Sequence, residues 1–326
     1  MKTKSLRTIA ATLLSIYILG VTTSGAQQIT ENAYEDTLPS IKNASLVWQG
    51  KFNGNWEIFF YNTETQVYRQ VTNNDSDDMW PETDGDWITW LGNGQIFVYD
   101  ISMETTVQIA IDAVKTYVNN PPHIASGRIV WTAHEVTDSV EPGDIFLYDA
   151  QGASTTCLSR SVDLDGTLDD RSPRINAEKV TWVQSGDGPT KRFLYDLATD
   201  TVSEAPDGFV WEDNPQVDGP LQVFTAHDGT DREIFVRDTD QKTTEQITNN
   251  EVEDHNPCIS GTQVAWVQGS GVNAEIHLSR GPSRCLSVDL DNDGDVDGTD
   301  LAQLLIFPEL PHYDAFSEKF GMTTCQ

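Results

Sequence analysis

The chain has 326 residues, a formal net charge of −31 and a hydrophobic content of 38%. This acidity argues against nucleic acid and anionic membranes as partners, because both attract basic surfaces. The apolar and aromatic content is high enough for a packed core, which excludes a disordered chain.

Residues 1–26 have the pattern of a secretory signal peptide. Three basic residues precede an apolar run over 9–21, and Ser24-Gly25-Ala26 supplies the small residues of a cleavage site. We therefore expect an exported chain that begins at Gln27 and has no membrane span after cleavage. Cleavage takes the net charge from −31 to −34, because the leader carries three basic residues and no acidic ones.

Gln27–Asn32 has the pattern of the end of a repeat, since QQITEN is similar to QVTNN at 70–74 and QITNN at 246–250. The last repeat of the chain lacks this strand. We therefore expect the N-terminal strand to complete the last repeat, which closes a ring and hides free sheet edges.

A module of short strands and turns recurs six times between residues 27 and 281. In each copy a proline stands nine residues before an aromatic residue that ends an apolar strand, and successive prolines are 42, 41, 51, 42 and 42 residues apart. A period of about 40–45 residues predicts propeller blades, so we expect an all-β, six-bladed β-propeller over 27–281. The six pairs are Pro39–Trp48, Pro81–Trp90, Pro122–Trp131, Pro173–Trp182, Pro215–Phe224 and Pro257–Trp266.

Three features of the module resemble TolB-type propeller repeats, the WD40-like PD40 group. They are the D-x-x-P opening, the apolar strand that ends in Trp or Phe, and the I-F-x-Y strands that begin at 58, 96 and 145. The resemblance covers about residues 27–280 and implies the propeller fold. It implies no single function, because propellers host many activities.

An acidic residue stands three positions before the repeat proline in five of the six copies. Equivalent positions of a ring lie on one circle, so we expect these acids to share one face. Each could cap a turn or bond the backbone of a neighbouring blade. Alternatively, the acids form a negatively charged mouth that attracts cations or a basic peptide. The five acids are Asp36, Asp78, Asp170, Glu212 and Asp254, and Asn119 breaks the set.

The strand-ending aromatic residues recur in every copy, which favours core packing between blades over a sugar-stacking surface. Trp56, Trp80 and Trp211 do not recur and are better candidates for a binding surface. A metal-dependent propeller lyase would need several histidines around a central channel. Only His123 and His255 lie within two residues of a repeat proline, so we expect no histidine-rich metal centre.

The four cysteines divide into two pairs. Cys285 and Cys325 bracket the last part of the chain and are predicted to form a disulfide, which export permits. Cys157 and Cys258 fall in the third and sixth copies, on opposite sides of a ring of six. A disulfide needs Cα atoms within about 7 Å, so we expect these two to be free thiols.

The C-terminal module over 285–326 contains a twelve-residue calcium loop, DLDNDGDVDGTD. Its aspartates occupy ligand positions of an EF-hand, and Gly294 stands where that loop turns sharply. Without a cation the carboxylates would repel one another, so we predict bound Ca²⁺. The predicted ligand residues are Asp289, Asp291, Asp293, Asp295, Asp297 and Asp300.

Aspartate at loop position 12, followed by apolar residues at helical spacing, resembles a dockerin repeat. The resemblance implies a small α-helical module, stabilised by calcium, for attachment or complex assembly. Dockerins usually have two calcium loops and this tail has one. Its partner could be a cohesin, a cell surface or the chain's own propeller.

These features favour a secreted, monomeric and non-enzymatic propeller scaffold that binds a protein or a glycan. We expect Sec-type export from a bacterium, to the medium or the cell surface. The alternative is a polysaccharide-degrading enzyme, a lyase or an O-glycosyl hydrolase. Dockerin-like tails accompany such enzymes, and the chain has many acids that could supply a catalytic pair.

Overall fold

The computed structural model describes residues 26–109, 115–118, 120–135, 142–162, 168–186, 188–205 and 216–280. Within these ranges no helix is long and apolar enough to cross a membrane. The predicted helical calcium module lies outside the described residues. Besides strands, the regular elements of the described residues are three short 3-10 segments, η1 (Phe52–Gly54), η2 (Ser159–Ser161) and η3 (Gly271–Asn273).

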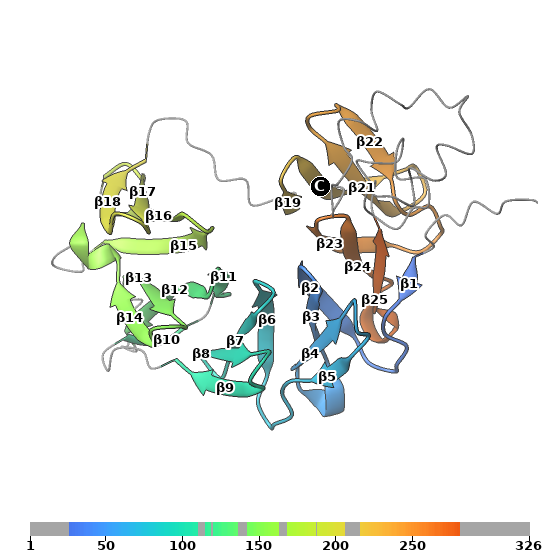
Figure 1. Cartoon of the computed structure of the whole chain (residues 1–326), viewed down its shortest axis with the longest axis horizontal. Coiled ribbons are helices and arrows are strands. Elements are labelled where there is room, and N and C mark those ends of the chain that lie inside the picture. Colours follow the sequence, from blue (N-terminus) through green and yellow to red (C-terminus); the bar gives the residue numbers. More distant parts are fainter. Residues whose placement is uncertain are drawn as a thin grey trace, which may run out of the picture.

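The strands form six antiparallel sheets, or blades, around a common centre (Figure 1). Blade 1 consists of β2 (Asp36–Lys42), β3 (Ser45–Gly50), β4 (Glu57–Asn62) and β5 (Tyr68–Gln70). Blade 2 consists of β6 (Asp78–Thr83), β7 (Trp87–Gly92), β8 (Gln95–Asp100) and β9 (Thr105–Gln108). Blade 3 consists of β10 (Lys115–Tyr117), β11 (His123–Ala125), β12 (Arg128–Glu135), β13 (Asp144–Asp149) and β14 (Ser154–Cys157).

The second half of the ring repeats this order. Blade 4 consists of β15 (Asp169–Ile175), β16 (Lys179–Ser185), β17 (Lys191–Asp196) and β18 (Thr201–Glu204). Blade 5 consists of β19 (Gln216–Asp218), β20 (Leu221–His227), β21 (Arg232–Asp238) and β22 (Thr243–Gln246). Blade 6 consists of β23 (Asp254–Ser260), β24 (Gln263–Gln268), β25 (Glu275–Arg280) and β1 (Gln27–Gln28). The predicted all-β, six-bladed architecture is therefore confirmed.

The first strand of the chain completes the last blade. Gln27 and Gln28 of β1 pair with β25, and the hydroxyl of Thr30 donates to Glu275 Oε2 over 2.5 Å. The prediction that the N-terminal strand closes the ring is confirmed. The last blade therefore has its outer strand, and β25 is paired instead of forming an exposed sheet edge.

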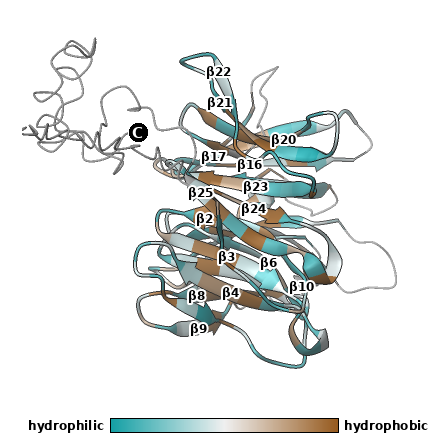
Figure 2. Ribbon diagram, turned by 90° about the vertical axis from the view of Figure 1, so that its right-hand side faces the viewer, coloured by the Kyte–Doolittle hydropathy of each residue, from teal (hydrophilic) through white to brown (hydrophobic). Residues whose placement is uncertain are grey.

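Tryptophan side chains fill the middle of the blades. Five of the six strand-ending aromatic residues are tryptophans that are at most 1% exposed, and each stacks on a ring of the next strand with centroids 5.6–5.9 Å apart. Five hydrophobic clusters each join two neighbouring blades, and Figure 2 shows the hydrophobic colour following the strands. The predicted core role is confirmed for these tryptophans, and Phe224 is half-buried.

The D-x-x-P opening forms a β-bulge in the first strand of four blades. Strand register shifts at this point. A non-glycine residue in the left-handed region costs about 1–2 kcal/mol, so the surrounding contacts must hold the bulge in place. The residues before the proline, with left-handed φ values of 49–56°, are Leu38, Trp80, Ser172 and Asn256.

In each bulge, the aspartate that stands two residues before the left-handed residue points into the blade. There its side chain contacts the core tryptophan. The indole Nε1 of the tryptophan donates to Oδ1 of the aspartate over 2.9–3.0 Å in all four blades. The four carboxylates are at most 3% exposed. The bond joins the first two strands of each blade. The pairs are Asp36–Trp48, Asp78–Trp90, Asp170–Trp182 and Asp254–Trp266.

The residue paired opposite each aspartate also suits the buried carboxylate. In blades 1 and 2 it is a glycine, and a Cβ on Gly50 would lie 2.5 Å from Asp36 Oδ1. In blades 4 and 6 it is a glutamine that donates to the carboxylate, as Gln268 Nε2 does over 3.0 Å. In blade 3, an alanine follows Trp131 by two residues, and the indole nitrogen of Trp131 has no hydrogen-bond partner.

Asp78→Ala should lower the free energy of unfolding by about 1–3 kcal/mol, because it leaves the buried indole N–H of Trp90 without an acceptor. Gly92→Ala should also destabilise, since the added Cβ would collide with the Asp78 carboxylate. The control, Asp75→Ala, removes an exposed acid and should cost less than about 0.5 kcal/mol. Urea unfolding measures all three, and equal midpoints for Asp78→Ala and Asp75→Ala would contradict the role of this bond.

Candidate functional site

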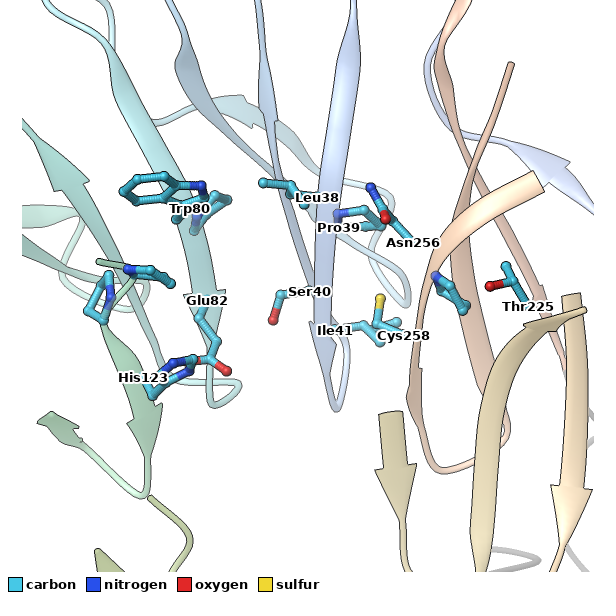
Figure 3. A pocket seen from close by; sticks show the side chains of 14 residues that line it. Leu38, Pro39, Ser40, Ile41, Trp80, Glu82, His123, Thr225, Asn256 and Cys258 are labelled. Atoms are coloured by element: carbon cyan, nitrogen blue, oxygen red, sulfur yellow. The ribbon is translucent and has the colours of Figure 1, made fainter. Parts of the chain in front are cut away.

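A pocket of about 360 Å³ lies at the centre of the ring. Its wall comes from the bulged first strands of blades 1, 2 and 6, with parts of blades 3 and 5. Prolines and the ring of Trp80 make it partly apolar, and Figure 3 shows Glu82 and His123 side by side below that ring. A concave site with an apolar lining and a few polar groups is what small ligands and extended segments bind.

The residue directly after each repeat proline occupies the same place in its blade, next to the centre. Four of these residues line the pocket, and Arg174 bonds one of them. Their types differ from blade to blade, although the proline before them does not. They are Ser40, Glu82, His123 and Cys258 in the pocket, with Arg174 and Gln216 at the same position of blades 4 and 5.

Sequence reasoning singled out His123 and missed Glu82 and Arg174. The available signal was a variable polar residue directly after an invariant proline of the repeat. In a repeat fold, such a position combines a fixed backbone with a free choice of side chain, which is typical of a binding position.

Glu82, His123 and Arg174 form a hydrogen-bonded chain across blades 2, 3 and 4. Glu82 Oε2 lies 3.2 Å from His123 Nδ1 and accepts the backbone N–H of Ile124 over 2.9 Å. On the other side of the imidazole, His123 Nε2 lies 2.6 Å from Nη1 of Arg174. A guanidinium can only donate, so Nε2 accepts and Nδ1 carries the hydrogen that faces Glu82.

This chain fixes the imidazole and occupies both of its nitrogens. A general base needs a nitrogen within hydrogen-bond reach of the substrate proton, and in this arrangement neither nitrogen of His123 faces the pocket without a partner. Glu82 and His123 therefore present a rigid polar edge to a ligand, and Arg174 holds the imidazole in place from outside the pocket lining.

The structure places the repeat acids inside the blades, and not around an open mouth. Asp36, Asp78, Asp170 and Asp254 are buried against their tryptophans, and Glu212 lies outside the described residues. In three blades the aspartate also contacts the loop before it, through a side chain and not through the backbone. There the second carboxylate oxygen accepts from an asparagine four residues earlier, over 2.6–2.9 Å. The main partner, the tryptophan of the same blade, was not expected.

Burial dominates the electrostatics of the Asp36 and Asp78 carboxylates. It raises the pKa of Asp36 to about 7, although the bonds from Asn32 and Trp48 act in the opposite direction. Burial also raises the pKa of Asp78 and of Glu57, which lies at the start of β4. The blades therefore contain carboxyl groups that hold protons more tightly than they would in water.

The other histidines do not gather at the pocket. His255 Nε2 contacts the carbonyl oxygen of Gly269 over 3.0 Å, and His227 Nδ1 accepts the backbone N–H of Gly229. His277 stacks on Trp266 in the core position that phenylalanine holds in other blades, and burial lowers its pKa. Of the histidines that the structure describes, only His123 lines the pocket.

Trp80 is the non-recurring tryptophan that lines the pocket. Trp56 lies elsewhere, with its ring under the ammonium group of Lys51, and Trp211 lies outside the described residues. Cys157 and Cys258 are free thiols. Burial raises the pKa of Cys258 to about 12, so it is a poor nucleophile in the pocket wall.

The predicted metal and disulfide residues of the tail lie outside the described residues. These are the calcium ligands between Asp289 and Asp300, and the pair Cys285 and Cys325. Within the described ranges, three acids of blade 5 come close enough to hold a metal ion, with ligand oxygens within 4.8 Å of one another. They are Asp228, Asp231 and Glu233.

The most informative comparisons are with solved propeller structures. An oligogalacturonate lyase in complex with manganese aligns with a TM-score of 0.52 and 12% identity, over 80% of this chain and 94% of that one. An oligogalacturonate lyase from Vibrio parahaemolyticus aligns with a TM-score of 0.50 and 12% identity, over 81% and 95% of the two chains. At this identity the similarity establishes the propeller fold and no activity.

TolB propellers are also among the structural neighbours. TolB from Acinetobacter baumannii aligns with a TM-score of 0.36 and 12% identity, over 69% of this chain and 60% of that one. No protein-family model and no curated protein matches the chain at the level of sequence.

The free energy of unfolding should fall as pH rises from about 4 to about 7. Across this window folded Asp36, with a pKa of about 7, retains a proton that the unfolded chain, with a pKa near 3.8, has released. Stability that depends on a retained proton decreases with pH. Asp36→Asn cannot ionise and should remove this part of the slope. Asp75→Asn, on the surface, should keep the wild-type slope in urea unfolding at several pH values. A wild-type slope in Asp36→Asn would contradict the assignment.

Proposed function

We propose that this protein is an exported, non-enzymatic propeller that binds a segment of another protein or a glycan in its central pocket. The observation that carries the proposal is the set of different polar residues at one structural position around that pocket. Ser40, Glu82 and His123 follow the repeat prolines and line the pocket, where a ligand could contact several blades at once, and Arg174 at the same position of blade 4 contacts His123.

The chemistry of the pocket suits recognition better than turnover. Trp80 offers a ring face that can stack on a sugar or on an apolar side chain, and the prolines leave a rigid apolar wall around it. Glu82 and His123 are held by each other and by Arg174, so they can orient a ligand through hydrogen bonds at little entropic cost.

The charge of the chain favours a basic or neutral ligand. The net charge of −31 repels polyanions at long range and attracts cationic segments. Arg174 is the guanidinium that adjoins the pocket through His123. A basic peptide segment or a neutral glycan fits this balance better than a polyuronate does.

The tail is proposed to attach the propeller to a partner or a surface. Ca²⁺ bound in its single loop, from Asp289 to Asp300, would neutralise the carboxylates and order the module. A Cys285–Cys325 disulfide would stabilise a unit that is too small for a large core. The proposed protein is a monomer in the medium or on the cell surface, with Ca²⁺ as its bound ion.

A polysaccharide lyase is the second candidate, for two specific reasons. The pocket contains His123, and two neighbours that align over most of the chain are oligogalacturonate lyases, one of them with manganese. Against it, the described histidines do not converge, and both nitrogens of His123 are engaged. A lyase would need a free base near the sugar.

Trp80→Ala should weaken ligand binding by at least about thirtyfold, because truncating a central aromatic hot spot costs about 2 kcal/mol or more. The mature protein would be applied to arrays of neutral glycans, polyuronates and basic peptides, and the affinity for the best binder measured by calorimetry. Trp56→Ala is the matched control, since Trp56 lies outside the pocket. Equal loss in both variants would argue against the pocket as the binding site.

The same ligands test the enzymatic alternative. We expect binding without new reducing ends and without the ultraviolet absorbance of unsaturated uronates. Turnover that is lost in His123→Ala would overturn the non-enzymatic proposal and establish the lyase.

A further inference from the structure

The hairpin between β20 and β21 in blade 5 carries an unusual group of acids. Asp228 begins its turn, and Oδ1 of Asp228 accepts the backbone N–H of Thr230 over 2.8 Å and that of Asp231 over 3.4 Å. Gly229 has a φ of 118°, which permits this tight turn. The turn holds the exposed carboxylate of Asp228 beside the side chains of Asp231 and Glu233.

Two of these acids are buried, and three of their four carboxylate oxygens lack a hydrogen-bond partner. Asp231 is 6% exposed and Glu233 is 0% exposed. Both carboxylate oxygens of Asp231 and Oε2 of Glu233 are buried without any hydrogen-bond partner, whereas Oε1 of Glu233 accepts the backbone N–H of Asn250 over 2.7 Å. Buried polar atoms are nearly always satisfied, so three in one place call for a missing partner.

The surroundings add negative charge. The charges that act on Asp231 come from Glu233, Asp228 and Glu253, with His227 as the single opposing group. Asp254 adds its charge at Glu233. Burial and these neighbours raise the pKa of both Asp231 and Glu233. Ionised carboxylates in this place need a positive partner.

Equivalent positions in other blades differ. Glu275 in blade 6 receives the hydroxyl of Thr30 on Oε2. Glu57 in blade 1 also has a buried Oε2 without a partner, but its hairpin has Phe52 and Asn55 where blade 5 has Asp228 and Asp231. The acid group therefore belongs to blade 5 and is not a general property of the repeat.

We propose that Asp228, Asp231 and Glu233 bind a hard divalent cation, Ca²⁺ in the first place, in the β20–β21 hairpin. Calcium takes carboxylate oxygens at about 2.3–2.6 Å, so two ligands on one ion lie no more than about 5 Å apart. The three ligand oxygens meet this condition, since all lie within 4.8 Å of one another. The exposed side of Asp228 gives the ion a route from solvent.

The ion would fasten blade 5 to blade 6. Glu233 already bonds Asn250, whose Nδ2 donates to the core aspartate Asp254 over 2.9 Å. A cation on Glu233 would thus connect the hairpin with the segment that enters β23. This site shares no residue with the predicted tail loop or with the central pocket, and it does not depend on the proposed function.

The test uses the full mature chain carrying Asp289→Ala and Asp293→Ala, so that the tail loop cannot contribute. Calorimetric titration of this parent with Ca²⁺ alone should show one site. Adding Asp231→Asn or Asp228→Asn should weaken it at least about tenfold. Glu57→Gln, at the position of blade 1 that is equivalent to Glu233, is the control and should leave the affinity unchanged.

Thermal unfolding separates a cation site from a merely strained acid group. With chelator, Asp231→Asn should melt above the parent, because it removes a buried charge without a partner. With saturating Ca²⁺ the parent should gain roughly 5 °C and melt above the variant. Asp228→Asn, at an exposed residue, serves if Asp231→Asn does not fold.

Three results would overturn the proposal. They are no heat of binding in the parent, unchanged binding in both aspartate variants, and a variant that melts above the parent with and without calcium. Tighter binding of Mg²⁺ or Mn²⁺, lost in Asp231→Asn, would support the site and overturn the choice of calcium.

Discussion

A hydrogen bond between a buried aspartate and a buried tryptophan joins the first two strands of four blades. Burying a carboxylate is costly unless donors surround it. Here the indole supplies one donor, and in three blades an asparagine of the preceding loop supplies another. The residue opposite the aspartate is a glycine that leaves room or a glutamine that donates. These contacts together hold a bulge whose left-handed residue would otherwise be unfavourable.

The same bulge also builds the candidate site. The aspartate three residues before the proline is buried in the blade. The side chain of the residue directly after the proline faces the centre of the propeller. Structure and recognition are thereby assigned to different positions of one short motif. Glu82, His123 and Arg174 can differ from their counterparts in other blades without disturbing the aspartate–tryptophan bonds.

The acids of this chain serve unequal roles. Those of the repeat are satisfied inside the blades, whereas in the hairpin of blade 5 both carboxylate oxygens of Asp231 and one of Glu233 have no hydrogen-bond partner. In blades 3 and 5, where this aspartate–tryptophan bond is not seen, the residue two positions after the strand-ending aromatic residue is neither glycine nor glutamine. Trp131 has an alanine two residues on, and so does Phe224, which has no N–H to donate. Glycine or glutamine at that place therefore signals a buried aspartate.

Spacing in the sequence by itself determined the number of blades, the closing strand and the core tryptophans, because a period and its missing strand need no three-dimensional information. It placed the repeat acids on one circle but could not give the direction in which they point. A bulge changes the side of the strand that a side chain occupies, so only the tertiary structure decided that Asp36 and its equivalents are buried. The tertiary structure alone also showed that His123 contacts Arg174, 51 residues away. Contacts between blades depend on the closure of the ring and not on the local sequence pattern.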